Sequence, residues 1–442
     1  MVRASKITII SIPAALLALA LAIYISSITI MHPSIWVKGI EICKFTRPQV
    51  LDMLKSITET SRLDSSIELF ADDRQWDLNF SDVGLSYYYY EAVNKAYMAK
   101  ESAGFINRLL NFLNIRNSDL NIDVKHSYDK VAVSNFIEKI AKEIDRESIT
   151  ATITMKSGDF IITDSTPGRS LDQQKTYELI IDQLDKAVAG SIQLPVAVTV
   201  PAVTRSDLLN IKDILGEFST EFNASDYDRV SNLSLATKNT SNVLLLPEDV
   251  FSFNKIVGPR LEKYGFKMAK IIVNNEYVSG IGGGICQVSS TLYNAVLYSN
   301  LEIVERKNHT LPSTYVDMGR DATISGDYID LKFKNNTGYP IYIYGEMKGN
   351  KVKFTIYGKD NFPDRSIELK TEIVSKTEPK TEIIEDPTLP EGTVIEERKP
   401  SPSYKVKSYK IIKQKGEDDI IEPLYTDVYP LVNGVKRVGT KK

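Results

Sequence analysis

The sequence predicts an α+β multidomain protein with a single N-terminal transmembrane helix, two repeated α+β modules, a central α+β domain and an elongated all-β tail. Three observations lead to this prediction. The length of 442 residues exceeds that of one ordinary domain, since domains average ~150 residues. An uncharged apolar run lies at the N-terminus, and the segments behind it alternate between helical and strand periodicity.

The composition excludes several functional classes. Hydrophobic residues make up 43% and charged residues 25% of the chain, which excludes a disordered chain and a protein with many membrane spans. With 54 basic and 57 acidic side chains, the chain has no excess positive charge to bind nucleic acid. Two cysteines and three histidines provide neither a disulfide framework nor the spacing of a metal site, so we expect no metal and no cofactor.

Residues 1–32 are expected to form a cytoplasmic N-terminus and a transmembrane anchor. The stretch from Ile7 to Met31 carries no charge, and as a helix at ~1.5 Å per residue it is long enough to cross a hydrocarbon core of ~30 Å. Arg3 and Lys6 precede it, so the positive-inside rule keeps the N-terminus in the cytoplasm. A cleaved signal peptide that ends near Ala18–Ala22 is the alternative. We expect a single-pass protein of the plasma membrane whose bulk is extracytoplasmic.

Two segments behind the anchor, residues 33–125 and 126–204, share one order of predicted elements. In each, a helix precedes two short strands, a glycine interrupts the pattern, and a second helix follows. These elements are predicted at 48–57, 66–70, 75–80 and 87–98 in the first segment, and at 133–144, 150–155, 160–163 and 173–188 in the second. The order predicts two repeated modules, an architecture more typical of binding than of catalysis. Chance similarity of two α+β segments is the alternative.

Residues 205–362 are expected to form the central α+β domain, and residues 363–442 a spacer and a β domain. Alternating strands are predicted at 328–333, 341–345 and 352–357, with glycine-containing turns between them. The segment 366–402 is rich in Glu, Lys, Thr and Pro, which predicts an extended spacer or edge strand. Alternation returns at 404–412, and few helical signals follow. We therefore expect an all-β tail.

One segment of the central domain combines the features of a reactive thiol. Its sequence is GIGGGICQVSSTLYNAVLYSN, in which four glycines precede Cys286 and an amphipathic helical pattern follows it. Cys286 therefore lies at a helix N-terminus, where unpaired backbone N–H groups and the helix dipole stabilise a thiolate. Since glycines let an extended ligand approach closely, we assign substrate binding to Gly282, Gly283 and Gly284, together with Gln287.

The same segment permits other interpretations. A phosphate-binding loop is excluded, because no Gly-Lys-Ser/Thr ending follows the glycines and their spacing does not match the dinucleotide fingerprint. Cys286 as a small packed residue stays open, since most buried cysteines have that role. A disulfide between Cys286 and Cys43 also stays open, because an oxidising exterior permits one.

A general base for Cys286 is available at His309, in the loop sequence RKNHTLP. A thiol nucleophile commonly uses a histidine as base and an acid or amide that orients the imidazole. Asp317 and Asp321 are the nearest candidates for the orienting acid, and Arg320 is suited to hold a carboxylate in a bidentate manner. An ordinary surface role for His309 is the alternative.

At these residues the central domain resembles the VanW family. The matching stretches, in order, are Phe251–Asn254, Val257–Arg260, Gly282–Asn294, Leu301–Arg306, His309 and Gly319–Thr323. We assign Asn254, in the first stretch, and Arg320, in the last, to substrate binding as well. The family is named after glycopeptide-resistance gene clusters. The resemblance therefore implies a cell-envelope setting more firmly than it implies a reaction.

The flanking regions have resemblances of their own. The two upstream modules are similar to the peptidoglycan-binding domain that often precedes VanW regions, which implies peptidoglycan or another cell-wall polymer as partner. The tail resembles the G-five domain, a β module credited with binding wall N-acetylglucosamine, through Leu389–Gly392 and Val438–Lys441. The central glycines of that domain are missing from residues 399–403.

Two hypotheses on function remain open. In the first, the protein is a membrane-anchored envelope factor that binds peptidoglycan, and its central domain is structural. In the second, the central domain is a cysteine-dependent hydrolase or transferase that acts on the peptide stems of peptidoglycan. Cys286 would attack an amide carbonyl, His309 would shuttle the proton, and Asp317 or Asp321 would orient the imidazole. The sequence does not decide whether the protein is an enzyme.

Overall fold

The computed structural model describes residues 14–22, 34–62, 65–102, 119–273 and 276–442. The chain divides into two compact units, one formed by Met1–Ser148 with Pro167–Val200, and one formed by Ile149–Thr166 with Pro201–Lys442. Helices and strands alternate up to residue 358, and strands alone follow it. The prediction of a mixed α+β multidomain chain with a largely β C-terminal region is confirmed.

The predicted transmembrane helix is wrong for the part of the chain that the structure describes. Within the apolar N-terminal run, the described helix covers residues 14–22. No helix among the described residues is long and apolar enough to cross a membrane. This finding contradicts the predicted single-pass localisation and gives no support to the membrane as a partner; the rest of the run lies outside the described residues.

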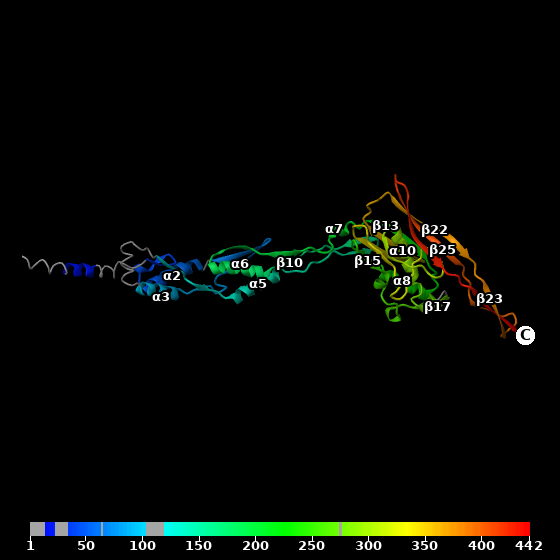
Figure 1. The fold of residues 1–442 in the computed structure, drawn as a ribbon, viewed down its shortest axis with the longest axis horizontal. Helices are drawn as coiled ribbons and strands as arrows, with labels where there is room; N and C mark the ends of the chain where they lie inside the picture. Colours follow the sequence, from blue (N-terminus) through cyan, green and yellow to red (C-terminus); the bar gives the residue numbers. More distant parts are fainter. Residues whose placement is uncertain (1–13, 23–33, 63–64, 103–118, 274–275) are drawn as a thin grey trace, which may run out of the picture. The chain divides into compact units, whose positions relative to one another are not determined.

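The first unit contains two apolar cores, and the first of them lies between two helices and a small sheet. Strand β1 pairs antiparallel with β2 and parallel with β6, and helices α2 and α3 lie side by side against them (Figure 1). Ile35, Val50, Leu54 and Val93 are fully buried in this core. The elements are β1 (Ile35–Val37), β2 (Ile40–Glu41), the 3-10 helix η1 (Ile42–Lys44), α2 (Arg47–Arg62), α3 (Tyr89–Ser102) and β6 (Leu120–Ile122).

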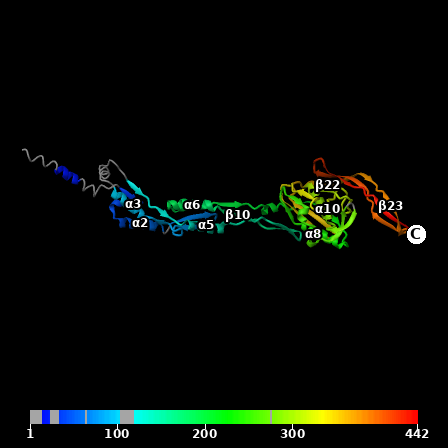
Figure 2. The same ribbon diagram turned by 60° about the horizontal axis from the view of Figure 1, so that its bottom comes forward.

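The second core of this unit joins segments from both expected modules. Hairpin β3–β4 forms a three-stranded sheet with β11, and helices α5 and α6 cover it (Figure 2). The hairpin of the first expected module thus shares its core with the helices of the second. The elements are β3 (Ser66–Ala71), β4 (Arg74–Asn79), α5 (Lys130–Ile144), α6 (Gln173–Lys186) and β11 (Gly190–Gln193), and the short pairs β5 (Ser86–Tyr87) with β7 (His126–Ser127) and β10 (Gly168–Leu171) with β12 (Val196–Thr199).

The second unit is built on an antiparallel sheet with the strand order β13-β21-β20-β14. Helices α8 and α10 pack against this sheet. The sheet strands and these helices are β13 (Asp213–Glu221), β14 (Val243–Leu245), β20 (Ile341–Lys348), β21 (Lys351–Gly358), α8 (Tyr227–Asn239) and α10 (Ile285–Tyr298). Smaller elements are β8 (Ile153–Lys156), β9 (Asp159–Ile162), α7 (Arg205–Leu208), β15 (Val250–Ser252), α9 (Phe253–Val257), η2 (Glu262–Tyr264), β16 (Met268–Val273), β17 (Glu276–Ile281), β18 (Glu302–Glu305) and β19 (Lys332–Lys334).

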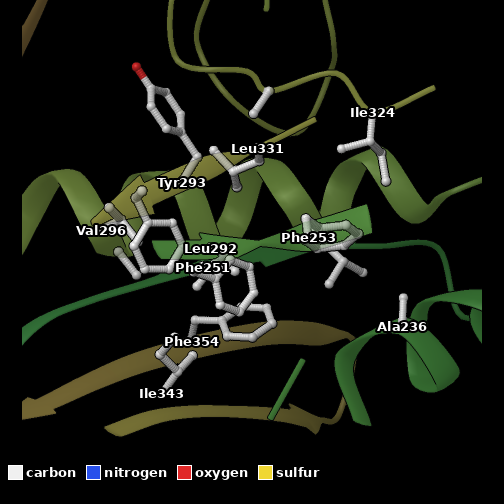
Figure 3. Packing of buried hydrophobic residues seen from close by; sticks show 14 of the residues in the cluster. Ala236, Phe251, Phe253, Leu292, Tyr293, Val296, Ile324, Leu331, Ile343 and Phe354 are labelled. Atoms are coloured by element: carbon white, nitrogen blue, oxygen red, sulfur yellow. The ribbon is translucent and has the colours of Figure 1, made fainter. Parts of the chain in front are cut away.

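Helix α10 runs through the middle of this core. Figure 3 shows Leu292 and Val296 among Phe251, Phe354 and other apolar side chains that lie along the helix. The expected amphipathic helix is buried nearly all round, because its polar side chains are buried as well. A helix that is covered on every side belongs to the interior of a domain, and each buried polar group in it needs a hydrogen-bond partner.

The C-terminal region forms two three-stranded sheets. In the first, β25 (Ser403–Gln414) lies between β22 (Arg365–Thr377) and β26 (Ile420–Tyr429). In the second, β27 (Gly434–Lys441) lies between β23 (Thr381–Pro390) and β24 (Val394–Arg398). Leu369, Leu424 and Tyr425 of the first sheet pack against the core that contains α10. This sheet therefore packs against the central domain.

Candidate active site

The glycines before Cys286 form the turn that starts helix α10. Gly282 and Gly284 have φ angles of 83° and 104°, values that side chains disfavour, and Gly284 is the N-cap residue. Cys286 is the second residue of the helix. Its Sγ lies 3.6 Å from the carbonyl oxygen of Ile324. In the described part of the chain its backbone N–H donates to no protein acceptor.

His309 and Asp321 form a buried pair beside this cysteine. The Nδ1–H of His309 donates to Oδ2 of Asp321 at 2.6 Å, and the backbone N–H of His309 donates to the same oxygen at 2.6 Å. The imidazole lies beside the thiol of Cys286, close enough to lower the pKa of that thiol. The exposed fractions of the two side chains are 6% and 1%. Two donors from one residue therefore fix both the position and the tautomer of the imidazole.

Polar side chains of α10 place Asp321 next to the helix. Ser289 Oγ donates to the carbonyl of Ala322 at 2.6 Å, and Asn294 Nδ2 donates to the carbonyl of Arg320 at 2.8 Å. Their acceptors flank Asp321 on both sides in the sequence. The polar residues that follow the cysteine thus hold the segment that carries the carboxylate.

The electrostatic environment favours an ionised thiol beside a protonated imidazole. Burial by itself raises the pKa of Cys286, but the hydrogen bond and charge of His309, together with the charge of Arg260, outweigh it and lower that pKa. Burial lowers the pKa of His309, but its hydrogen bonds to Asp321 and Cys286 raise it to about 10. Burial raises the pKa of Asp321, but the hydrogen bond and charge of His309, the charge of Arg306 and the hydrogen bond from Tyr429 together outweigh it and lower that pKa. These shifts favour the thiolate, the imidazolium and the carboxylate over the neutral forms of the three side chains.

Cys286 and His309 line one cavity of about 750 Å³. Arg229, Arg260 and Tyr315 line it as well. Its size is within the ~300–1,000 Å³ that small-ligand pockets usually have. The thiol is thus reachable, and a substrate of peptide size has room beside it.

Comparisons with known proteins place this site in a family. A family model described as VanW like protein matches residues 228–357. The uncharacterized protein YoaR of Bacillus subtilis is 37% identical over 228 residues, which are 51% of this chain and 74% of that protein. The chain belongs to the VanW-like family. The vancomycin B-type resistance protein VanW of Enterococcus faecalis is 32% identical over 130 residues, which are 28% of this chain and just under half, 47%, of that protein.

Other parts of this VanW-like chain have matches of their own. A model described as "Putative peptidoglycan binding domain" matches residues 76–193, a range that covers parts of both expected modules. An IgA1 protease G5 domain is 26% identical over 18% of this chain and 94% of its own, with a TM-score of 0.14. The HP0197-G5 structure is 20% identical over 17% of this chain and 97% of its own, with a TM-score of 0.12. TM-scores this low do not establish a shared fold, so the resemblance of the tail to the G-five domain stays a prediction.

The structure brings most residues assigned to substrate binding to the cavity of the VanW-like domain. Asn254, Gly282, Gly284 and Gln287 line it. Gln287 is buried, and it holds Arg229 by accepting a 2.9 Å hydrogen bond from the guanidinium. Gly283 instead packs against the backbone of strand β16, where an added Cβ would lie 2.6 Å from the Lys270 carbonyl oxygen.

The remaining two assigned residues lie elsewhere. Arg320 donates to Oδ1 of Asn294 at 2.7 Å and stacks over the ring of Phe218, so its guanidinium has a role in packing. Asp317 is 3.6 Å from Arg320, and 75% of its side chain is exposed. Of the two candidate acids, Asp321 is the one that the structure places against His309.

Several residues of the site were not assigned from the sequence. Arg260 was available from the Val257–Arg260 stretch, but its proximity to the thiol depends on the fold. Arg306, Asp427 and Tyr429 surround Asp321. Arg306 lies at the end of a matching stretch, whereas Asp427 and Tyr429 lie more than a hundred positions from Asp321, and no local pattern marks them.

Cys43 and Cys286 are not joined by a disulfide in the structure. Among the residues that the structure describes, no group of three or more His, Cys, Asp or Glu side chains could hold a metal ion.

Proposed function

We propose that this VanW-like protein acts on the cell wall, and that its central domain transfers acyl groups from peptidoglycan peptide stems through Cys286. The setting is supported by the match of residues 76–193 to a peptidoglycan-binding domain and by the vancomycin-resistance relative. The reaction is supported by one observation above all: the imidazole of His309 is hydrogen-bonded to the carboxylate of Asp321 and lies beside the thiol of Cys286, and Cys286 and His309 line one cavity.

The acylation step follows from this arrangement. The Cys286 thiolate attacks the carbonyl carbon of a stem amide, and a carbon–sulfur bond forms. The free N–H of Cys286, at the helix N-terminus, is placed to bind the oxyanion of the tetrahedral intermediate. The imidazolium of His309 then gives its proton to the leaving amine as the carbon–nitrogen bond breaks. The products are a thioester on Cys286 and a free amine.

Deacylation regenerates the site. An incoming amine or a water molecule attacks the thioester carbonyl, and neutral His309 takes the proton of this nucleophile. The carbon–sulfur bond breaks, and Cys286 leaves as a thiolate beside the imidazolium. An amine acceptor gives a new amide, whereas water gives a carboxylic acid. Asp321 holds the imidazole in one orientation during both steps.

The peptidoglycan-binding match supports a second role, for residues 76–193. We propose that residues 76–193 hold the wall polymer while the central domain acts on it. Binding without chemistry is the second candidate function, because this match stands without any contribution from Cys286. The two candidates differ in one respect: whether the cysteine is needed for a covalent change in the wall.

The decisive experiment incubates the full chain with purified peptidoglycan and follows the muropeptides and the mass of the protein by mass spectrometry. Wild-type protein and Cys43→Ser are expected to change the muropeptide pattern, and an acyl adduct is expected on Cys286. Cys286→Ala is expected to leave the muropeptides unchanged. If Cys286→Ala and wild type give the same muropeptides, the catalytic proposal fails.

Wall binding is measured separately by co-sedimentation of the full chain with the same peptidoglycan. Wild type and Cys286→Ala are expected to sediment equally, since the thiol lies outside the matched residues 76–193. A wild-type protein that stays in the supernatant would remove the binding assignment without touching the catalytic one.

A further inference from the structure

From the contacts around Asp321 we infer that strand β26 completes the catalytic site: Tyr429 and Asp427 position Asp321, and through it His309. The inference rests on the proposed function, and it makes the C-terminal region a part of the catalytic apparatus. Both residues lie outside residues 228–357, which the VanW model matches. They touch neither the cavity nor the thiol, so they are positioning residues.

Tyr429 holds the carboxylate oxygen that His309 does not use. Its hydroxyl donates to Oδ1 of Asp321 at 2.6 Å, whereas His309 bonds Oδ2. The same hydroxyl accepts a 2.8 Å hydrogen bond from the backbone N–H of Gly319, two residues before Asp321. Tyr429 is fully buried. It therefore fixes both the carboxylate and the backbone that carries it.

Asp427 acts through the arginine that competes for Asp321. Nη1 of Arg306 donates to both carboxylate oxygens of Asp427 at 2.7 Å. Its Nη2 lies 3.3 Å from Oδ1 of Asp321. The side chains of Arg306 and Asp321 are each 1% exposed. A buried guanidinium needs a full counter-charge. Because Asp427 supplies this negative charge to Arg306, the carboxylate of Asp321 remains available to pair with the imidazolium of His309.

Packing keeps β26 in this place. Leu424 and Tyr425 of the strand contact the core of the central domain, and the ring of Tyr425 lies 5.0 Å from the guanidinium of Arg306. An added Cβ on Gly319 would lie 3.4 Å from Ser408 and Val406 of the neighbouring strand β25. The sheet and the segment before Asp321 are thus in close contact, with little freedom to separate.

The test is the pH dependence of Cys286 alkylation by iodoacetamide in the full chain, with the modified peptide identified by mass spectrometry so that Cys43 does not contribute. Several titratable and charged side chains face the triad, and the dependence of the alkylation rate on pH reflects all of them. They are Tyr293 of α10, Arg229 of α8, Arg260, Arg306 and Tyr315, and Tyr425, Asp427 and Tyr429 of β26.

Tyr429→Phe keeps the ring and removes both hydrogen bonds. We expect the midpoint of its alkylation profile to move to higher pH, as for a thiol pKa raised by ~1. The alkylation rate should then be about tenfold lower than that of wild type at mildly acidic pH and equal to it at the alkaline plateau. Tyr409→Phe, the same change on the neighbouring strand β25, is expected to keep the wild-type profile. Partial unfolding would expose Cys286 as an ordinary thiol and would also move the profile to higher pH, so the melting temperature of each variant is measured beside it.

Asp427→Asn provides a second variant, because it keeps the size of the side chain and an acceptor for Arg306. It is expected to move the midpoint in the same direction as Tyr429→Phe, and melting temperatures show that each variant is folded. If both variants keep the wild-type midpoint while His309→Gln moves it, the inference about β26 is overturned and the proposed function stands. If wild type itself titrates like an ordinary thiol near ~8.5, the inference and the proposed function fall together.

Discussion

The guanidinium of Arg260 donates a hydrogen bond to Oδ1 of Asn254, and both side chains line the cavity that contains Cys286. The Nε atom of Arg260 is buried without a hydrogen-bond partner in the described part of the chain. A cation that is held beside a thiol and incompletely paired stabilises the thiolate. Arg260 therefore belongs to the electrostatics of the nucleophile as well as to the wall of the cavity.

Replacement of Arg260 by Met is expected to raise the pKa of Cys286, because the positive charge beside the thiol is lost. Alkylation of Cys286 at mildly acidic pH should become about three- to tenfold slower, as expected for a change of ~0.5–1 in pKa. Lys263→Met, which removes an exposed positive charge of η2, is the control and should react like wild type. Equal rates for all three proteins would exclude an electrostatic role of Arg260.

The activity should depend on pH through both members of the ion pair. The pKa of Cys286 is lowered and that of His309 is raised to about 10. Muropeptide conversion should rise with pH as the thiolate forms, stay level, and fall as the imidazolium loses its proton near that upper value. Because the pKa of His309 is raised on folding, its contribution to stability is complete below ~6.5 and is lost as the pH rises through the folded value. Conversion rates and melting temperatures over the same pH range check both statements.

Two aspartates near His309 are expected to differ sharply in their importance. Asp321→Asn removes the charge that faces the imidazole, so alkylation of Cys286 at mildly acidic pH should fall at least about tenfold. Asp317→Asn should have no effect, since the side chain of Asp317 is 75% exposed. The two variants carry the same chemical change four positions apart. Comparable losses in both would contradict the assignment of Asp321 as the orienting acid.

The helix-start glycine Gly284 should tolerate no side chain. An added Cβ would lie 2.9 Å from Cγ of Arg229, and the φ angle of 104° is itself unfavourable for alanine. Gly284→Ala should therefore lower the free energy of unfolding by about 2–4 kcal/mol. Gly416→Ala is the matched control, because its φ angle is 84° and nothing lies within 4 Å of the added Cβ. Denaturant unfolding of both variants separates backbone strain from the contact with Arg229.

The sequence revealed those parts of the site that depend on local structure. Glycines followed by a helical period place Cys286 at a helix start, and a helix start has the same electrostatics wherever it lies in a fold. His309 could be named because the central region contains no other histidine. The contribution of Asp427 and Tyr429 could not be predicted, because they meet Arg306 and Asp321 across 121 and 108 positions of chain. Such contacts are set by tertiary packing and leave no periodic signal.

The order of helices and strands was likewise easier to predict than their packing. Periodicity identifies a hairpin at Ser66–Asn79 but does not say which helices cover its apolar face. Hydropathy alone also favoured a membrane span at the N-terminus, where the described helix covers residues 14–22.

The shared core of hairpin β3–β4 and helices α5 and α6 has a consequence for how the first unit unfolds. Ile67 and Leu69 on one side of residue 125 are buried against Ile137 and Ile140 on the other. Proteolysis between the two halves therefore leaves the hairpin and the two helices without the surface that covers their apolar faces. The hairpin and the two helices should melt together in a single cooperative transition.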